Sequence, residues 1–143
     1  MFHLVYTSHS TQQFSEGDLI LLLKQCRDSN KLNGITGMLL YLQGKFIQVL
    51  EGEKAMVETL YSNIKEDSRH TRIITVMQGT SPKRLFSGWT MGFKKLSFEE
   101  AHQLSGFQDI DIFFKQPITE DSNLLLVFLG LFYKKNMVDY AEL

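Results

Sequence analysis

The stretch that most constrains the fold is residues 33–52, NGITGMLLYLQGKFIQVLEG. Two apolar runs, Ile35 to Leu42 and Phe46 to Leu50, are separated by Gln43-Gly44, a pair that favours a tight turn between antiparallel strands. The stretch therefore predicts a β-hairpin. Because both arms are apolar almost throughout, we expect the hairpin to lie inside a sheet rather than at its edge.

One polar residue interrupts the second arm of this hairpin. Gln48 shares a strand face with Phe46 and Leu50, since side chains two residues apart point to the same side. A buried amide without hydrogen-bond partners costs about 1–3 kcal/mol. Another residue or a ligand must therefore form hydrogen bonds with Gln48.

The segments on either side of the hairpin predict two helices. Ser15 is a helix N-cap, and Asp18 completes an approximate capping box for a helix that ends near Asn30. A second helix follows Gly52 and ends near Asp67. The apolar residues that repeat at helical spacing are Leu19, Leu22, Leu23 and Cys26 in the first helix and Met56, Val57, Leu60, Tyr61 and Ile64 in the second.

Three further strands are expected from alternating or β-branched residues. They are residues 2–7, 72–77 and 89–93, with polar loops at 8–13 and 79–88. On the first strand, Tyr6 lies on the same face as Phe2 and Leu4.

The order β-α-β-β-α-β-β predicts an α+β fold, a ferredoxin-like sheet with one added strand and two helices on one face. We expect this domain to cover residues 1–95 and a C-terminal helical extension to cover 96–143. The extension would contain a short helix at 97–104 and a long one at 119–137. Because residues 124–132 are apolar nearly all round, that helix should pack against the domain, against a second subunit, or against both.

Composition excludes several classes of partner. The chain has 143 residues, which predicts one domain, and its net charge of −1 gives no indication of a nucleic-acid or acidic-membrane partner. The single cysteine, Cys26, cannot form an intramolecular disulfide, and it is expected to be a core residue. The N-terminus lacks the features of a signal peptide, and the apolar run 124–133 is too short to span a bilayer. We therefore expect a cytoplasmic protein.

Metal and nucleophile chemistry are not expected. The four histidines, His3, His9, His70 and His102, lack metal-ligand spacing. The sequence also contains no G-x-S-x-G, H-E-x-x-H, G-x-G-x-x-G or Walker motif.

The polar strand residues leave two interpretations open. Tyr6 and Gln48 either satisfy each other within the core or face a ligand that lies between the two helices. Other residues also have ordinary structural explanations: Asn30 as a helix C-cap, Arg69 and His70 as a solvated helix end, and Trp89 and Met91 as core side chains.

Taken in order, these residues resemble the BLUF family of blue-light sensors using flavin, over roughly the first 95 residues. The motifs that carry the resemblance are Tyr6 with Ser8, Asn30, Thr36-Gly37, FIQVLEG at 46–52, DSRH at 67–70 and SGWTM at 87–91.

The resemblance implies a flavin, normally FAD with FMN as the alternative, whose ring lies between the two helices and on the sheet. It implies that Tyr6 donates an electron to the photoexcited flavin and that Gln48 bridges this tyrosine and the flavin. The residues implied to bind the cofactor are Asn30, Gln48, Ile64, Arg69 and His70, and those implied to carry the signal are Ser8, Trp89 and Met91. Ser29 departs from the family, because some members carry His or Asn there.

The resulting hypothesis is a short stand-alone photoreceptor rather than an enzyme. Rearrangement of Gln48, by rotation or tautomerisation, would give a red-shifted signalling state that a separate protein or a change in a homo-oligomer reads. One alternative is a small flavin-dependent oxidoreductase. The other is a ferredoxin-like interaction module without a cofactor, in which Tyr6 and Gln48 only pair in the core.

Overall fold

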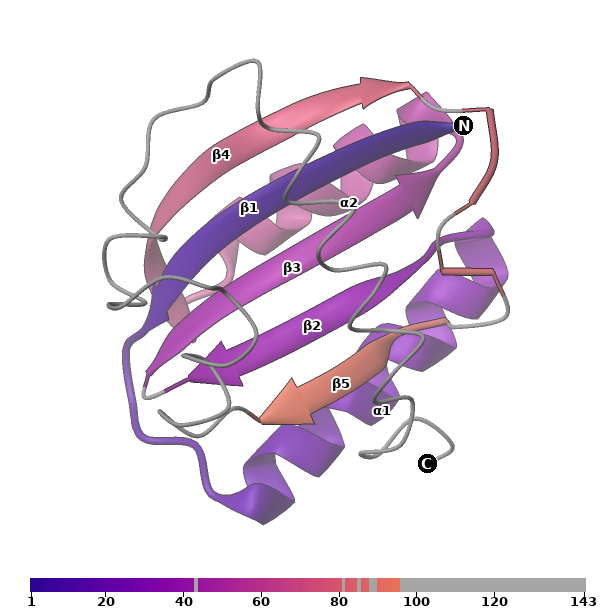
Figure 1. Ribbon diagram of the computed structural model, residues 1–143. Helices are drawn as coiled ribbons and strands as arrows, with labels where there is room; N and C mark the ends of the chain where they lie inside the picture. The colour runs from indigo at the N-terminus through magenta and orange to yellow at the C-terminus, as the bar shows by residue number, and fades with distance from the viewer. Residues whose placement is uncertain (43, 81, 85, 88–89, 96–143) are drawn as a thin grey trace, which may run out of the picture.

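The structure is a computed structural model of the chain and describes residues 1–42, 44–80, 82–84, 86–87 and 90–95. These residues form a five-stranded sheet and two helices, both of which cover the same face of the sheet (Figure 1). In chain order the elements are β1 (Phe2–Ser10), α1 (Glu16–Asn33), β2 (Thr36–Leu42), β3 (Lys45–Gly52), α2 (Lys54–Glu66), β4 (His70–Thr80) and β5 (Gly92–Lys95).

The strands lie in the order β4-β1-β3-β2-β5, and all neighbours are antiparallel except β2 and β5, which are parallel. The first four strands have ferredoxin-like order, and β5 is the added strand. This arrangement confirms the predicted α+β fold. It also confirms that the β2–β3 hairpin lies inside the sheet, because β3 is the central strand and β2 has a neighbour on each side.

Local sequence signals explain where α1 begins and ends. Ser15 Oγ accepts a hydrogen bond from the Asp18 N–H, and Asp18 Oδ2 accepts one from the Ser15 N–H, each at 3.1 Å. The capping box is therefore confirmed. The predicted end near Asn30 was wrong, because the helix continues to Asn33 and ends at Gly34, whose left-handed φ of 65° suits glycine. Asn30 is thus not a C-cap residue.

Strand boundaries differ most from the predictions. The polar residues expected as a loop after residue 7 continue β1, since Ser8 pairs with Phe46 and His9 pairs with Lys45 and Thr71. Backbone pairing does not require apolar side chains, so periodicity missed this extension. The same reason applies to β4, which runs from His70 to Thr80 rather than over 72–77.

The fifth strand also begins later than predicted. It covers Gly92–Lys95, and Thr90 and Met91 come before it. Trp89 lies outside the described residues, as do the predicted helices of the extension at 96–143.

The core lies between the sheet and the two helices. It includes Leu19 and Leu23 of α1 and Val57 and Tyr61 of α2, all among the buried residues. Cys26 is only partly buried at its margin. The prediction for Met56 was wrong, because 40% of this residue is exposed.

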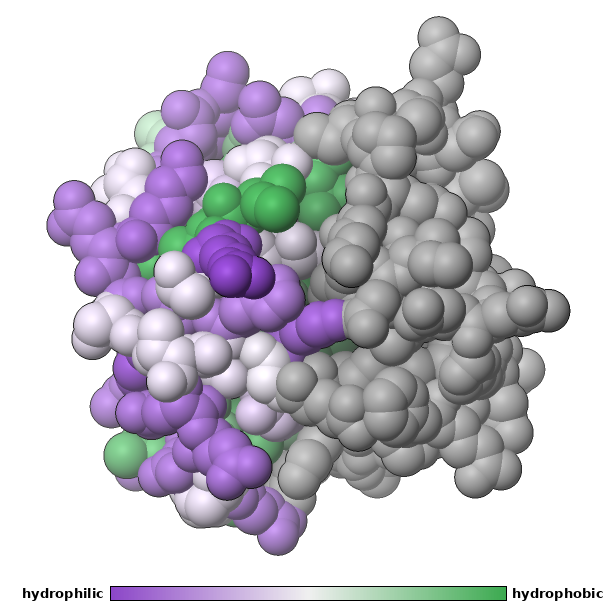
Figure 2. All heavy atoms as spheres, turned by 90° about the vertical axis from the view of Figure 1, so that its left-hand side faces the viewer, coloured by the Kyte–Doolittle hydropathy of each residue, from purple (hydrophilic) through white to green (hydrophobic). Residues whose placement is uncertain are grey.

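One face of the molecule is largely polar among its described residues. Figure 2, which views the molecule from the left-hand side of Figure 1, shows mostly hydrophilic residues with a smaller hydrophobic area among the coloured atoms. Neither described helix is long and apolar enough to cross a membrane.

Candidate functional site

A cavity of about 220 Å³ lies between α1, α2 and the sheet. Its floor is formed by sheet residues that include Tyr6, Leu39, Phe46 and Gln48. Its walls include Leu22 and Asn30 from α1, and Leu60 and Ile64 from α2. All six residues predicted for photochemistry or cofactor binding line it: Tyr6, Asn30, Gln48, Ile64, Arg69 and His70.

Tyr6 and Gln48 form the centre of the cavity floor. They lie directly opposite each other on β1 and β3, and each is 4% exposed. The Tyr6 phenol donates a hydrogen bond to Gln48 Oε1. At the other end of the amide, Gln48 Nε2 donates to Met91 Sδ over 3.5 Å. Both ends of the buried amide are therefore satisfied, and the two residues pair with each other while also facing the cavity.

The Tyr6 phenol is held in its neutral form. Burial is the main cause that raises its pKa well above 10.0, and the neighbouring Cys26, Tyr61 and Asp67 add to the effect. The Tyr61 ring lies nearby, with 5.4 Å between the ring centroids. At neutral pH, Tyr6 therefore retains the proton that it donates to Gln48.

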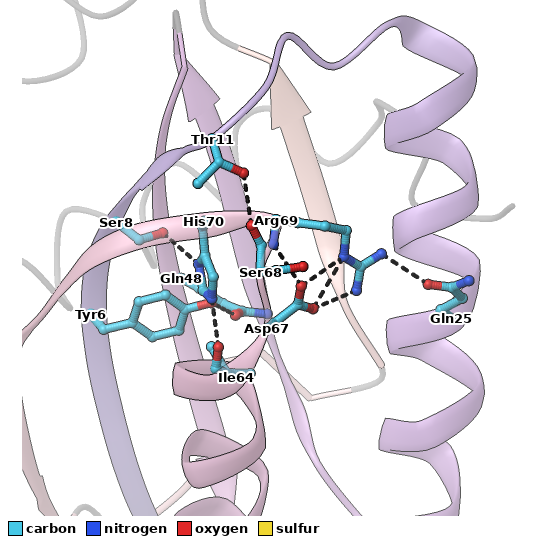
Figure 3. Close-up of polar contacts among 10 residues, drawn as sticks. All are labelled: Tyr6, Ser8, Thr11, Gln25, Gln48, Ile64, Asp67, Ser68, Arg69 and His70. Carbon is cyan, nitrogen blue, oxygen red and sulfur yellow. Dashed lines mark hydrogen bonds and ion pairs between the residues drawn. The ribbon is translucent and has the colours of Figure 1, made fainter.

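His70 connects the cavity to β1. Its Nε2 lies 2.6 Å from the carbonyl oxygen of Ile64, and its Nδ1 lies 2.9 Å from Ser8 Oγ (Figure 3). A carbonyl can only accept, so Nε2 carries a proton, and in the neutral ring Nδ1 accepts from the Ser8 hydroxyl. Ser8, which is 1% exposed, thus orients the ring although it does not line the cavity.

Arg69 bridges the two sides of the cavity. Its Nε and Nη2 donate to the carboxylate of Asp67 at 2.6–3.1 Å, and its Nη1 donates to Gln25 Oε1 on α1 at 3.1 Å (Figure 3). Hydrogen bonding to Arg69 lowers the pKa of Asp67, and the same bond raises the pKa of Arg69. No prediction gave Asp67 or Gln25 a role. The Gln25 contact joins residues 44 positions apart and has no local signal, whereas Asp67 lies only two positions before Arg69.

Two residues on the inner side of α1 hold the segment before β5. Asn30 Nδ2 donates to the Thr90 carbonyl at 2.6 Å, and Arg27 Nε donates to the Met91 carbonyl at 2.8 Å. Arg27 was also missed by the sequence predictions. The signal was present, because Leu23, Arg27 and Asn30 follow the i, i+4, i+7 spacing of one helix face.

The remaining α1 residues at the cavity are Cys26 and Ser29. Burial raises the pKa of the Cys26 thiol to about 11, so the thiol is neutral at physiological pH. Ser29, the departure from the family pattern, lines the cavity from an exposed position. In the described part of the chain, no three His, Cys, Asp or Glu side chains are grouped closely enough to hold a metal ion.

The donor set of the cavity fits a flavin ring. Leu22, Phe46 and Ile64 offer apolar contacts to a flat aromatic system, while the Asn30 and Gln48 amides offer both donors and acceptors to its polar edge. A few convergent polar groups in an otherwise apolar cavity are typical of cofactor sites.

Comparisons with known proteins agree with this geometry. The family model BLUF, described as sensors of blue-light using FAD, matches residues 1–92. The photoactivated adenylate cyclase subunit beta of Euglena gracilis is 38% identical over 89 residues, which make up 62% of this chain and 10% of that protein. This chain thus spans about a tenth of the length of that curated relative.

Two solved structures share the fold. The BlsA photo-activated state has a TM-score of 0.76 and 26% identity, with coverage of 91% of this chain and 94% of that chain. Klebsiella pneumoniae BlrP1 with FMN and cyclic diGMP has a TM-score of 0.66 and 27% identity, with coverage of 96% and 36%. Together with the family match over residues 1–92, these findings show that the chain belongs to the BLUF family of flavin-binding blue-light sensors.

Proposed function

We propose that this BLUF photoreceptor responds to light through a switch formed by Tyr6 and Gln48. The observation that carries the proposal is the amide of Gln48, held at Oε1 by the Tyr6 phenol and at Nε2 by Met91 Sδ. A carboxamide has an acceptor at one end and donors at the other, so reorientation exchanges them. As long as Tyr6 keeps its proton, the phenol is a donor, so the orientation in which the Gln48 carbonyl oxygen faces Tyr6 is the favoured one.

Light would release this constraint. A flavin held in the cavity would supply the light absorption and a one-electron acceptor. Tyr6 would give up one electron and its phenolic proton to that flavin and later regain both, so the cycle has no net oxidation. While the proton is absent, Gln48 loses the donor that fixes its carbonyl end, and the amide rotates or tautomerises. A stronger hydrogen bond from the rearranged amide to the flavin would lower the excitation energy, and hydrogen bonds are stronger in a low-dielectric core. Absorption is therefore expected to shift slightly to the red.

Asn30, Ile64, Arg69 and His70 are the residues that we propose to bind the flavin together with Gln48. Their position around the cavity supports this assignment. The volume of about 220 Å³ lies below the range of roughly 300–1,000 Å³ for a complete small-molecule site. It therefore suits a ring system better than a whole dinucleotide. FAD is proposed because the family uses FAD, with FMN as the alternative, since both carry the same ring.

The signal is proposed to leave the domain through a separate downstream protein or through a change in a homo-oligomer. The relative from Euglena gracilis is named as an adenylate cyclase subunit, and this chain matches a tenth of it. Light scattering coupled to size exclusion, in darkness and under blue light, tests the oligomer. A strict monomer in both states would contradict it. A cytoplasmic location remains a prediction.

The absorption spectrum of the purified protein, in darkness and just after blue light, tests the proposal. We expect flavin bands that shift slightly to the red and return in darkness. Bleaching of the flavin, or NADPH-dependent flavin reduction in the dark, would support the oxidoreductase alternative, although a BLUF domain is a sensor module rather than a catalytic one. A protein that stays colourless after incubation with FAD would support the cofactor-free interaction module.

A further inference from the structure

Arg27 is a charged residue on the buried side of α1. It is 7% exposed, and its Nε donates to the carbonyl oxygen of Met91 at 2.8 Å. Burial of a guanidinium is unfavourable unless hydrogen bonds compensate for the lost water, and charge-assisted hydrogen bonds are the strong ones. Desolvation accordingly lowers the pKa of Arg27. A long alkyl side chain would fill the same space without this penalty, so the charged group requires an explanation.

The contact of Arg27 leads directly to the proposed switch. The Met91 main chain is held by Arg27, and the Met91 side chain is 1% exposed with its Sδ 3.5 Å from Gln48 Nε2. One turn along α1, Asn30 holds the preceding carbonyl, that of Thr90, at 2.6 Å. Two successive carbonyls before β5 therefore accept hydrogen bonds from α1.

The Met91 side chain also has little free space on the sheet. A Cβ placed on Gly37 of β2 would lie 3.3 Å from Met91 Cε, so the methyl group sits against the bare glycine backbone. A thioether in free space finds alternative rotamers easily. Here the confined site limits those rotamers, so the position of the Met91 main chain decides whether Sδ stays beside Gln48.

We infer that Arg27 is a positioning residue that holds Met91 against Gln48 and thereby sets how fast the light-induced state returns to the dark state. The inference rests on the proposed function of Tyr6 and Gln48. Arg27 holds the Met91 main chain through its carbonyl oxygen. The Met91 sulfur contacts the Gln48 amide, and the amide must break that contact in order to reorient. The amide must turn within the space that Met91 bounds in either direction, so loosening Met91 lowers the barrier for its return and speeds recovery.

Dark recovery after a blue flash, measured in the flavin-loaded protein, tests this inference. Arg27→Met removes the donor and keeps the alkyl volume, and we expect recovery to become about three- to tenfold faster, since tenfold corresponds to about 1.4 kcal/mol in the barrier. Lys24→Met is the matched control, because Lys24 lies one turn earlier on the same helix and is exposed. Recovery of Arg27→Met within twofold of the control would overturn the inference.

A double variant separates positioning from general support of the fold. In Met91→Ala the sulfur is absent, so the additional Arg27→Met change should no longer alter recovery. An equal acceleration in both backgrounds would show that Arg27 does not act through Met91 and would overturn the inference. If Arg27→Met fails to retain flavin, Arg27→Gln is tested instead. Its side chain keeps an N–H donor, so its recovery rate should lie between the rates of wild type and of Met91→Ala.

The outcome is distinguishable from failure of the proposed function. If the wild-type protein shows no reversible red shift, the photoreceptor switch is wrong. If the wild type cycles and the Arg27 variants recover like Lys24→Met, only the role of Arg27 is wrong.

Discussion

The Tyr6 phenol on β1 donates a hydrogen bond to Oε1 of Gln48, its direct partner in the β1–β3 register. Both residues are polar, both are 4% exposed, and both line the cavity between the helices. The pair therefore satisfies buried polar groups within the protein while it also faces the cavity that we propose to hold the flavin.

Tyr6→Phe is expected to keep the flavin and abolish the red shift. The aromatic ring still packs in the core, but the phenolic proton that fixes Gln48 is absent. Loss of the donor leaves a buried amide oxygen without this partner, which should cost about 1–3 kcal/mol of unfolding free energy. Difference spectra before and after blue light, with urea unfolding, measure both effects. A normal light-induced shift in this variant would show that the switch is misassigned.

Gln48→Leu is expected to bind flavin and show no red shift, because an apolar side chain offers the Tyr6 phenol no acceptor and the flavin no donor. Gln78→Leu on β4 is the matched control, since Gln78 is exposed. Only the first variant should lose the light response. If both retain it, the hydrogen bond between Tyr6 and Gln48 is irrelevant to the spectrum.

The raised pKa of Tyr6 predicts a specific loss of stability at alkaline pH. Above pH 10.0 the unfolded chain releases this phenolic proton, whereas the folded protein retains it because burial raises the pKa. The folded state then binds more protons than the unfolded state, so the unfolding free energy falls as pH rises above 10.0.

Urea unfolding of wild type and Tyr6→Phe between neutral pH and alkaline pH measures this contribution. One retained proton corresponds to a slope difference of up to about 1.4 kcal/mol per pH unit above the ordinary tyrosine pKa. The variant should show the shallower decline. Parallel curves for the two proteins would contradict a raised pKa at Tyr6.

Gly37→Ala is expected to destabilise the sheet strongly. A Cβ at this position would lie 1.9 Å from the carbonyl oxygen of Val49, which is main chain and can move only if β2 and β3 separate. We expect a loss of about 3 kcal/mol or more, at the upper end of overpacking effects. Thermal and urea unfolding provide the measurement.

Gly17→Ala is the control for Gly37→Ala. Gly17 lies in α1, where a Cβ would meet only Ser15 Oγ at 3.8 Å. Alanine is the better helix former, so this change should be neutral or stabilise by up to about 1 kcal/mol. Equal stability of the two variants would argue against the close approach of β2 and β3 at Gly37.

Elements whose signals are local could be predicted from the sequence. The two apolar arms around Gln43-Gly44 predicted the hairpin, and Ser15 with Asp18 predicted the start of α1. Helical spacing predicted the buried Leu19 and Leu23. Each of these signals depends on residues within a few positions of one another, because hydrogen bonding and side-chain period in a helix or hairpin are set locally.

Contacts between elements distant in sequence decided how far the strands extend and which side chains meet. Ser8 and His9 continue β1 because β3 and β4 offer them main-chain partners. Arg69 finds Gln25, and Arg27 finds the carbonyl of Met91, across 44 and 64 positions of sequence. Such contacts depend on how helices lie on a sheet, which no local period encodes. For that reason the sequence pointed to Tyr6 and Gln48 as an exceptional pair, whereas only the fold brought Met91 beside Gln48 and Arg27 to the Met91 carbonyl.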